Sequence, residues 1–239
     1  MAGVYTVVSG AAAEEKRLSF ITNNLANALT AGYKSSRPVF EAVLSSSIIE
    51  TDQADSTFVG TYDSHINFSE GPLIESGNRL DAAIQGDGFF VVQTAQGDKY
   101  TRNGHFSLDP NGKLVTQDGN VVAGESGEIV APGKLITIEK DGSIYAEKNL
   151  VGKIRVVRFA DKSLLRPVGS SLFENEDPSN EASPAVNVTV SQGFHEGSNV
   201  DVIKEMIDMI ACTRIYEAYG KVQQGFSDME SKLQEAARV

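Results

Sequence analysis

The chain has 239 residues and a mass of 25.6 kDa, which is enough for one large domain or two small ones with hydrophobic cores. With 41% hydrophobic and 22% charged residues, it has the composition of a globular protein and not of a disordered one. The net charge of −11, with no compensating basic patch, argues against nucleic-acid binding, because such a chain repels phosphate backbones.

The sequence predicts no membrane insertion and no cleaved export signal. No stretch is long and apolar enough for a helix to cross a bilayer. Residues 1–20 lack a basic head followed by an apolar core, so we expect a protein that stays in the cytoplasm or leaves it by a route without a cleaved signal. The single cysteine, Cys212, excludes an intrachain disulfide and lies in an apolar helical pattern typical of a buried side chain.

Residues 1–31 are predicted to form an N-terminal helix. Small or apolar side chains recur there at alternating steps of three and four, interrupted only by Glu14, which is a heptad-like stripe typical of a helix that packs on another helix. We expect the helix to end near Gly32, which can adopt the left-handed cap conformation, and Pro38 hinders a restart. The stripe consists of Val4, Val7, Ala11, Leu18, Ile21, Leu25 and Ala28.

Three asparagines, Asn23, Asn24 and Asn27, lie beside this stripe, although asparagine is a mediocre helix former. A single asparagine in such a place is most often an exposed polar residue. Several together favour another interpretation, because an amide both donates and accepts hydrogen bonds and is satisfied at a helix contact only in particular registers. We therefore predict that these amides set the alignment of helix contacts between chains.

Residues 76–192 are predicted to form a mainly antiparallel β-domain, after an extended or β-rich linker region over residues 32–75. Short runs rich in β-branched and aromatic residues alternate with turn signals such as Asp109-Pro110-Asn111-Gly112 and Asp141-Gly142. The acidic stretch ENEDPSNEASPA predicts a surface loop, and the polar residues 45–69 predict weak strands. The strand-like runs are FFVVQT, KYTRNGHFSL, KLVTQ, LITIE, SIYAE and KIRVVRF.

Residues 193–239 are predicted to form the C-terminal helix, with Ser198 or Asn199 as its cap and Asp201 in a first turn where the helix dipole favours an anion. A helix of this length needs a partner along it. The fold class is therefore α+β, with long N- and C-terminal α-helices that form a coiled-coil-like pair and flank a mainly antiparallel β-domain. The apolar face consists of Ile203, Met206, Ile210, Ile215, Tyr219, Val222, Phe226, Met229, Leu233 and Ala236.

Signals for catalysis or metal binding are weak. The three histidines, His65, His105 and His195, are isolated, and none has the spacing of a metal pair. The SLDPNGK stretch partly matches a calcium loop, but predicted strands flank it and the usual last glutamate is missing. The Gly-x-Gly of QGDGFF precedes a strand instead of a helix, and no nucleophile elbow is present. We therefore predict no enzyme activity, no cofactor and no metal site.

The stretch NNLANALTAGYK resembles the N-terminal signature of the bacterial flagellar axial proteins, which include the flagellar basal-body rod protein family. Two further stretches agree, namely SGNRLDAAIQGDGFFVV at the start of the β-domain and GFHEGSNVDVIKEMIDMIACTRIYEA in the C-terminal helix. The short chain and the opening GVYTVVSGAA are most similar to the proximal-rod members, with a distal-rod or other axial rod or hook subunit as the alternative. Ala28-Leu29 departs from the Val-Asn pair that is usual in the family.

The resemblance implies a structural subunit of the rod, the drive shaft that transmits torque from the flagellar motor to the hook. In that family the terminal helices form an inner tube of a helical array and the β-domains form the outer layer. The implied partners are other axial rod proteins, the flagellar type III export apparatus and, as an open alternative, copies of the same chain. The implied location is the periplasmic rod of the basal body.

The predicted subunit interface combines the two helix stripes with the residues that match the family signatures. An alternative from another class is a metal- or carbohydrate-binding β-domain on a coiled-coil stalk, which converging acid and histidine side chains or rows of exposed aromatic residues would favour. The predicted interface residues are Val4, Val7, Ala11, Leu18, Ile21, Asn23, Asn24, Leu25, Asn27, Ala28, Gly32, Tyr33, Ser198, Asn199, Val200, Asp201, Ile203, Met206, Ile210, Arg214, Tyr216, Tyr219, Val222, Phe226, Met229 and Leu233.

Overall fold

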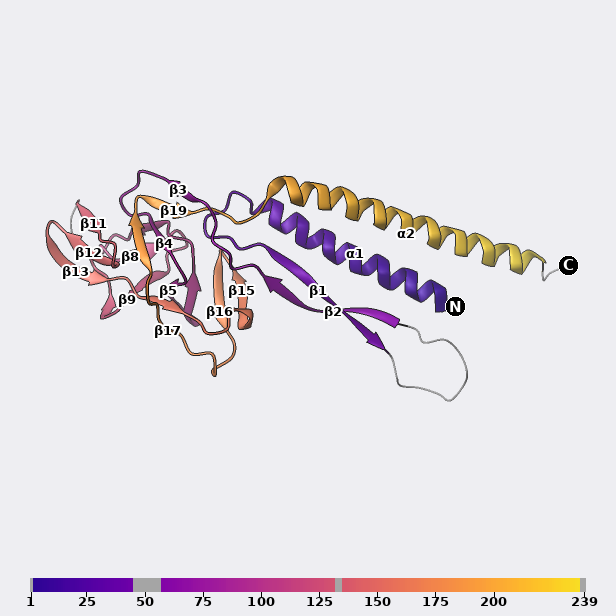
Figure 1. Ribbon diagram of the computed structural model, residues 1–239, viewed down its shortest axis with the longest axis horizontal. Coiled ribbons are helices and arrows are strands. Elements are labelled where there is room, and N and C mark those ends of the chain that lie inside the picture. The colour runs from indigo at the N-terminus through magenta and orange to yellow at the C-terminus, as the bar shows by residue number, and fades with distance from the viewer. Residues whose placement is uncertain (1, 45–56, 132–134, 237–239) are drawn as a thin grey trace. The chain divides into compact units, whose positions relative to one another are not determined.

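The computed structural model describes residues 2–44, 57–131 and 135–236 (Figure 1). The chain divides into two compact units. The first, which we call the helical unit, comprises residues 1–26, 36–66 and 201–239. The second, which we call the β-unit, comprises residues 27–35 and 67–200. Each unit therefore contains segments from both halves of the chain.

The helical unit consists of two helices and one hairpin. Helix α1 spans Ala2–Ala26 and helix α2 spans Val202–Ala236. Strands β1 (Ser36–Leu44) and β2 (Thr57–Ile66) pair antiparallel, from Ser36 opposite Ile66 to Leu44 opposite Thr57, with one irregularity after Val39. Figure 1 shows α1 lying between α2 and this hairpin, so that α1 contacts a different element on each of two sides.

The two helices run antiparallel and approach closely at two points. Gly10 of α1 faces Tyr219 of α2, and a Cβ atom at Gly10 would lie only 2.7 Å from the tyrosine ring. One turn further along, the thiol of Cys212 donates to the backbone oxygen of Glu14 at 3.2 Å and to its carboxylate at 3.1 Å. The small Gly10 and the buried Cys212 therefore set the distance between the helices.

The prediction that the two terminal helices form a long coiled-coil-like pair is wrong. Ile203, Met206 and Ile210, which were expected at the helix seam, are 73%, 53% and 54% exposed. Among the residues of α2 whose burial is described, Glu205 and Cys212 are the buried ones. The reason is that α1 shares its surface between α2 and the β1–β2 hairpin, so it cannot cover a continuous apolar face of a helix that has 35 residues against its own 25.

The β-unit is mainly antiparallel, as the sequence predicts. Its largest sheet has the strand order β15-β16-β6-β5-β9-β8-β7, with β10 on β9, and β14 joining β5 to β17. Smaller sheets follow the orders β11-β12-β13, β18-β4 and β19-β3. The strands are β3 (Leu73–Glu75), β4 (Ala82–Gln85), β5 (Phe89–Thr94), β6 (Gly97–Thr101), β7 (Phe106–Leu108), β8 (Leu114–Thr116), β9 (Val121–Gly124), β10 (Gly127–Glu128), β11 (Ile136–Ile138), β12 (Ser143–Ala146), β13 (Asn149–Lys153), β14 (Val156–Arg158), β15 (Leu165–Gly169), β16 (Leu172–Asn175), β17 (Ser183–Pro184), β18 (Thr189–Gln192) and β19 (Phe194–Glu196), with a 3₁₀ turn at Lys162–Leu164.

The central strand β5 supplies much of the core of the β-unit. Phe89, Phe90, Val91 and Val92 are at most 1% exposed, so both faces of this strand are covered. The predicted run FFVVQT coincides with β5, and the expected turns at residues 109–112 and 141–142 join β7 to β8 and β11 to β12. The structure confirms these predictions. They succeed because a continuous apolar run and turns with Asn-Gly or Asp-Gly are strong local signals.

Other boundaries differ from the expected ones. Helix α1 ends at Ala26 and not near Gly32, and residues 27–32 form turns. Gly32 does take the expected positive φ of 66°. The acidic loop after β16 contains the two-residue strand β17. Of the weak strands expected over residues 45–69, β2 is present from Thr57, and residues 45–56 lie outside the described part of the chain.

Over the described residues, neither helix combines the length and apolarity that crossing a bilayer requires.

The environment of Cys212 predicts a thiol of low reactivity. Burial, and secondarily the hydrogen bond and the charge of Glu14, raise the pKa of this thiol to about 11. Because the thiolate is the reacting species, we expect alkylation of the native protein at pH 8 to be at least about a hundredfold slower than that of a free cysteine. Iodoacetamide labelling followed by mass spectrometry measures the rate, with the denatured protein as the control. Equal rates for native and denatured protein would contradict the contact between α1 and α2.

Candidate functional site

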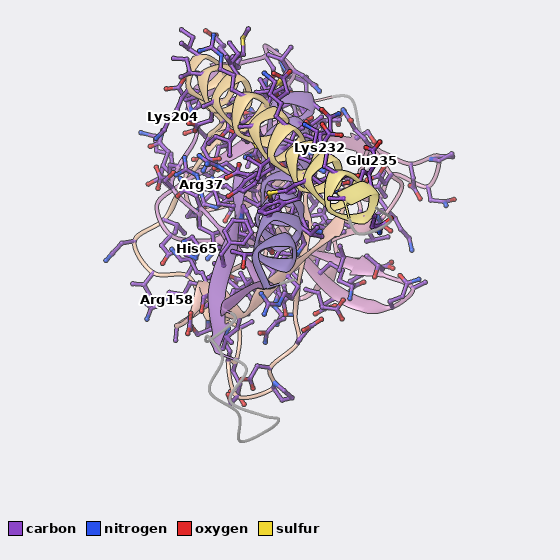
Figure 2. All side chains as sticks on the ribbon, turned by 90° about the vertical axis from the view of Figure 1, so that its right-hand side faces the viewer. Arg37, His65, Arg158, Lys204, Lys232 and Glu235 are labelled. Carbon is purple, nitrogen blue, oxygen red and sulfur yellow. The ribbon has the colours of Figure 1, made fainter. Side chains whose placement is uncertain are left out.

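The exposed apolar side chains along α2 form a candidate binding surface. Many large apolar side chains of this helix lie open to solvent, whereas the core residues of the chain are almost completely covered. Charged side chains such as Lys204 and Lys232, labelled in Figure 2, come from the same helix. Exposed apolar surface of this extent is typical of a protein contact. The side chains are Val202, Ile203, Met206, Ile207, Ile210, Ile215, Tyr216, Val222 and Met229; we call them the α2 surface.

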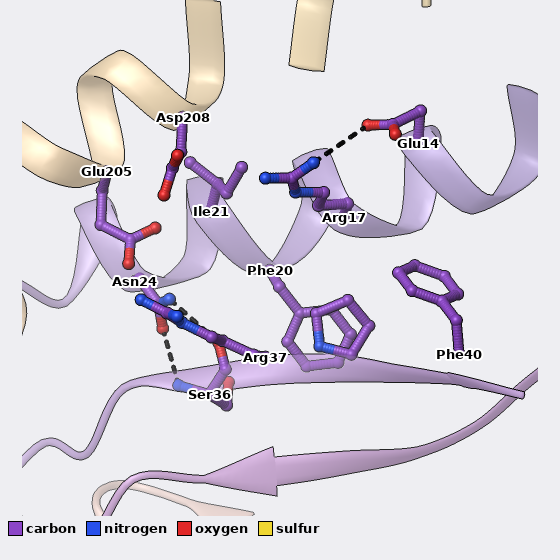
Figure 3. A pocket seen from close by; sticks show the side chains of 11 residues that line it. Glu14, Arg17, Phe20, Ile21, Asn24, Ser36, Arg37, Phe40, Glu205 and Asp208 are labelled. Carbon is purple, nitrogen blue, oxygen red and sulfur yellow. Dashed lines mark hydrogen bonds and ion pairs between the residues drawn. The ribbon is translucent and has the colours of Figure 1, made fainter. Parts of the chain in front are cut away.

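A pocket of about 350 Å³ lies beside this surface, between α1, α2 and the start of β1 (Figure 3). Phe20 and Phe40 supply aromatic rings to it, and Arg17, which pairs with Glu14 at 3.8 Å, lies on the α1 side. Glu205 and Asp208 reach it from α2. The remaining lining residues are Ile21, Asn24, Ser36, Arg37 and Pro38. Aromatic and charged groups together suit a side chain with an apolar stem and a polar end.

Asn24 closes the connection between α1 and β1 within the chain. Its side chain is 1% exposed, its Nδ2 donates to the carbonyl oxygen of Ser36 at 3.0 Å, and its Oδ1 accepts from the Ser36 amide at the same distance. A two-way bond of this kind suits an amide, because one atom donates and a second atom accepts, whereas an ionised carboxylate has no donor. For its neighbour Asn27, Oδ1 accepts from the Thr30 hydroxyl at 3.2 Å, in the turn that follows α1.

A buried charge cluster lies in the β-unit. Glu196 of β19 accepts a short hydrogen bond from Lys34 Nζ and a bond of 3.2 Å from Arg102 Nη1, and the three side chains are at most 2% exposed. The backbone amide of Gly71 donates to the same carboxylate at 2.9 Å. Burial lowers the pKa of Lys34, and the charge of Glu196 opposes this shift. Arg102 also donates to the Gly86 carbonyl oxygen at 2.7 Å.

Asn199 joins three segments of the same unit. Its Oδ1 accepts from the Ser35 amide at 2.7 Å, and its Nδ2 donates to the carbonyl oxygens of Asn67 at 2.7 Å and Ser69 at 3.1 Å. Gly32, at a positive φ, lies so close to the Asn103 backbone that any side chain would collide with it. Several residues that match the family signatures are therefore engaged within the chain.

The predicted interface residues fall into classes of exposure. Ile21, Asn24, Gly32 and Ser198 are buried, and the side chains of Val4 and Leu233 lie outside the described part of the chain. The half-buried residues are Val7, Ala11, Leu18, Leu25, Asn27, Ala28, Tyr33, Asn199, Val200, Tyr219 and Phe226. The exposed residues are Asn23, Asp201, Ile203, Met206, Ile210, Arg214, Tyr216, Val222 and Met229. The exposed set, mostly on α2, is available for contact with another chain, and its interface role stays a prediction.

The sequence interpretation missed one cluster. Asp81, His105 and His195 have potential ligand atoms that all lie within 4.8 Å of one another in the β-unit. His105 Nδ1 is 2.9 Å from Asp81 Oδ2, and the two imidazole rings are 4.2 Å apart between centroids. Burial, followed by the charge of His105, lowers the pKa of His195, while Asp81 opposes the shift. Spacing in the sequence gives no sign of this cluster, because strand pairing brings the residues together.

Three domain families match the chain in the order of its structural segments. Residues 4–34 match the flagella basal body rod protein family, residues 83–146 match the flagellar hook protein FlgE/F/G D1 domain, and residues 191–236 match the C-terminal domain of flagellar basal body rod FlgEFG proteins. The matched segments correspond to α1 with its following turn, the middle of the β-unit, and β19 with α2. The fold and its domain order thus define the class of flagellar hook and rod proteins.

Full-length relatives narrow this class. The flagellar basal-body rod protein FlgG of Buchnera aphidicola is 33% identical, with 94% of this chain and 95% of the relative covered. FlgG of Bacillus subtilis is 33% identical with 92% of both chains covered, and FlgF of Caulobacter vibrioides is 32% identical with 90% and 89% covered. The chain belongs to the flagellar basal-body rod protein family. Its identity to FlgF and FlgG proteins is nearly equal and does not separate the two kinds.

Replacement of Asn24 by alanine is expected to destabilise the helical unit. The variant leaves the amide and the carbonyl of Ser36 without their buried partner, so we expect a loss of about 1–3 kcal/mol in the free energy of unfolding. Chemical denaturation measures the loss, and hydrogen exchange at the Ser36 amide localises it. Asn23→Ala, which changes an exposed neighbour on the same helix, is the matched control and should lose less. Equal losses for the two variants would contradict the role of Asn24.

Replacement of Glu196 by glutamine is expected to destabilise the β-unit much more. Two buried cationic groups, Lys34 and Arg102, then lose their counter-charge, and breaking a buried ion pair on one side typically costs about 3–5 kcal/mol. Thermal and urea unfolding of the purified protein measure the effect. Glu125→Gln, which changes one partner of the solvent-exposed Lys153–Glu125 pair, is the control and should alter stability by less than about 1 kcal/mol. A loss of that small size for Glu196→Gln would contradict the structural role of the cluster.

Proposed function

We propose that the chain is a structural subunit of the flagellar rod and that it binds neighbouring axial subunits through its helical unit. As a member of the basal-body rod protein family it belongs to the flagellar basal body and to a group of structural proteins. The observation that carries the proposal is the α2 surface, because a helix with this much exposed apolar area gains free energy when a partner covers it.

The arrangement of the exposed residues favours a helical or grooved partner. Ile203, Ile207 and Ile210 follow one another at steps of four and three, so they form one face of α2 and are 73%, 62% and 54% exposed. Complete burial of such a side chain contributes about 1.5–3 kcal/mol. Association costs about 4–15 kcal/mol in lost freedom, so several such contacts along α2 are needed on each subunit of an array.

We further propose that the occupants of the α2 surface are the terminal helices of neighbouring axial subunits, either other rod proteins or copies of this chain. The terminal helices would then form the inner tube and the β-unit the outer layer, which gives the assembly its torsional stiffness. Torque from the motor would pass to the hook through these repeated contacts. Family membership supports this arrangement, and the exposed apolar helix supplies the adhesive surface that it needs.

Delivery of the subunit is part of the proposal. We propose that the flagellar type III apparatus exports the chain in an unfolded or partly folded form to the periplasm, without a cleaved signal. The helical unit is suited to this route, because its elements come from three separate parts of the chain and can form only after the whole chain is available. Folding of helices on docking is favoured where an isolated helix is only marginally stable.

The double variant Ile203→Glu/Ile207→Glu is expected to abolish rod assembly without unfolding the protein. Both side chains are exposed, so the free energy of unfolding should change by less than about 0.5 kcal/mol per site. Buried carboxylates at a subunit contact are strongly unfavourable, so cells that carry only this variant should not swim. Swimming in soft agar and electron microscopy of basal bodies measure the outcome.

The matched control is Leu150→Glu, which introduces the same charge at an apolar residue of the β-unit that is 62% exposed. It should leave swimming unchanged. Immunoblots of periplasmic fractions separate failed export from failed assembly, since the double variant should reach the periplasm in normal amounts. Normal swimming of the double variant would refute the proposed role of the α2 surface.

A further inference from the structure

Three side chains from distant parts of the sequence meet at one place in the β-unit. Asp81 precedes β4, His105 precedes β7, and His195 is the central residue of β19. One potential ligand atom from each lies within 4.8 Å of the others. Asp81 is buried, with a side chain 3% exposed, whereas the His105 side chain is 26% exposed. Asp81 therefore lies on the buried side of the cluster, and His105 lies on the side that is open to solvent.

The backbone holds these three positions together. The amide of Ala82 donates to the Gly104 carbonyl oxygen at 3.0 Å, which ties the chain beside Asp81 to the chain beside His105. Gly104 has no room for a side chain, because a Cβ atom there would collide with the Ala82 carbonyl. The Gly193 amide donates to the Asp81 carbonyl oxygen at 2.8 Å, two residues before His195. The geometry of the cluster is therefore fixed by the fold and not by flexible loops.

The polar atoms of the cluster are oriented but incompletely satisfied. Asn78 Nδ2 donates to Asp81 Oδ1 at 2.8 Å, which leaves Oδ2 to face His105. His195 Nδ1 is buried and has no hydrogen-bond partner among the described residues. A buried imidazole nitrogen without a partner is unfavourable, and a bound water or ion is one way to satisfy it. Ligating carboxylates in protein metal sites are held by outer hydrogen bonds, as Asn78 holds Asp81 here.

We propose that Asp81, His105 and His195 form a binding site for a divalent transition-metal ion, with Zn²⁺ as the ion that fits best. Two imidazole nitrogens favour zinc and related transition metals over Mg²⁺ and Ca²⁺, which prefer oxygen ligands. Tetrahedral zinc with bonds of about 2.0–2.1 Å needs ligand atoms roughly 3.3 Å apart, so small side-chain rotations suffice to close the site. Three protein ligands leave one coordination position for water or for a group from another molecule.

The site goes beyond the proposed rod function and does not depend on it. A metal ion bound there would link the starts of β4 and β7 to β19, so it should stabilise the β-unit. At a zinc concentration one hundred times the dissociation constant, the folded-to-unfolded ratio should rise about a hundredfold. A rod subunit that fails to bind zinc would still be a rod subunit, and a zinc-binding chain need not form a rod.

Zinc titration of the full chain without a histidine tag, after removal of metal with EDTA, tests the proposal. Isothermal calorimetry should show one ion per chain, and added Mg²⁺ should not compete. His105→Gln and His195→Gln should each weaken binding by at least about tenfold. His65→Gln is the matched control, because His65 is an exposed histidine of β2 in the helical unit, labelled in Figure 2, and its loss should change nothing.

X-ray absorption of the zinc-loaded wild-type protein provides a reading that does not depend on how the variants fold. Two imidazole ligands per zinc are expected. The proposal is overturned if binding is far below one ion per chain, if fewer than two imidazoles are found, or if both folded histidine variants bind zinc as tightly as the wild type. Circular dichroism and thermal unfolding of each variant establish which variants are folded.

Discussion

The buried carboxylate of Glu196 is the contact on which the β-unit depends. It receives hydrogen bonds from Lys34, from Arg102 and from the amide of Gly71, which come from three segments far apart in the sequence. Lys34 and Glu196 are 162 residues apart in the sequence. A buried anion of this kind is tolerated only when its partners are in place, so its pairing requires that the first and last segments of the unit be correctly docked.

These contacts and those of the helical unit show what several residues of the family signatures do in the fold. Gly32, Lys34 and Asn199 close the β-unit from its two ends, and Asn24 fixes the turn from α1 into β1. These residues make contacts within the chain, and the predicted role of the asparagines in contacts between chains stays a prediction. The apolar side chains that α2 leaves exposed, several of them within the C-terminal signature stretch, are the surface that we propose for other chains. Some signature residues are therefore engaged inside the subunit, whereas others, such as Asn23 and Met206, are exposed, and their interface role stays a prediction.

The parts of the fold that could be predicted from the sequence are those that depend on interactions between residues close together in the chain. Strand β5 and the turns at residues 109–112 and 141–142 depend on neighbours in the chain, and they were predicted correctly. The period of α2 predicted an apolar face but could not tell what covers it, since period carries no information about the partner. The cluster at Asp81, His105 and His195 depends on strand register between distant segments, so no spacing rule could reveal it.

The antiparallel contact of the helices also leaves the end of α2 without a helical neighbour among the residues that the structure describes. Gly10 lies opposite Tyr219, so the first residue of α1, Ala2, falls opposite about residue 227 of α2, which continues to Ala236. Met229 lies in this last stretch and is 53% exposed. A helical end without tertiary contacts is marginally stable in water, because most helical stability comes from packing of its apolar face. A neighbouring subunit that covers α2 would therefore both bind the chain and complete its longest helix, so that assembly and the final step of folding become one event.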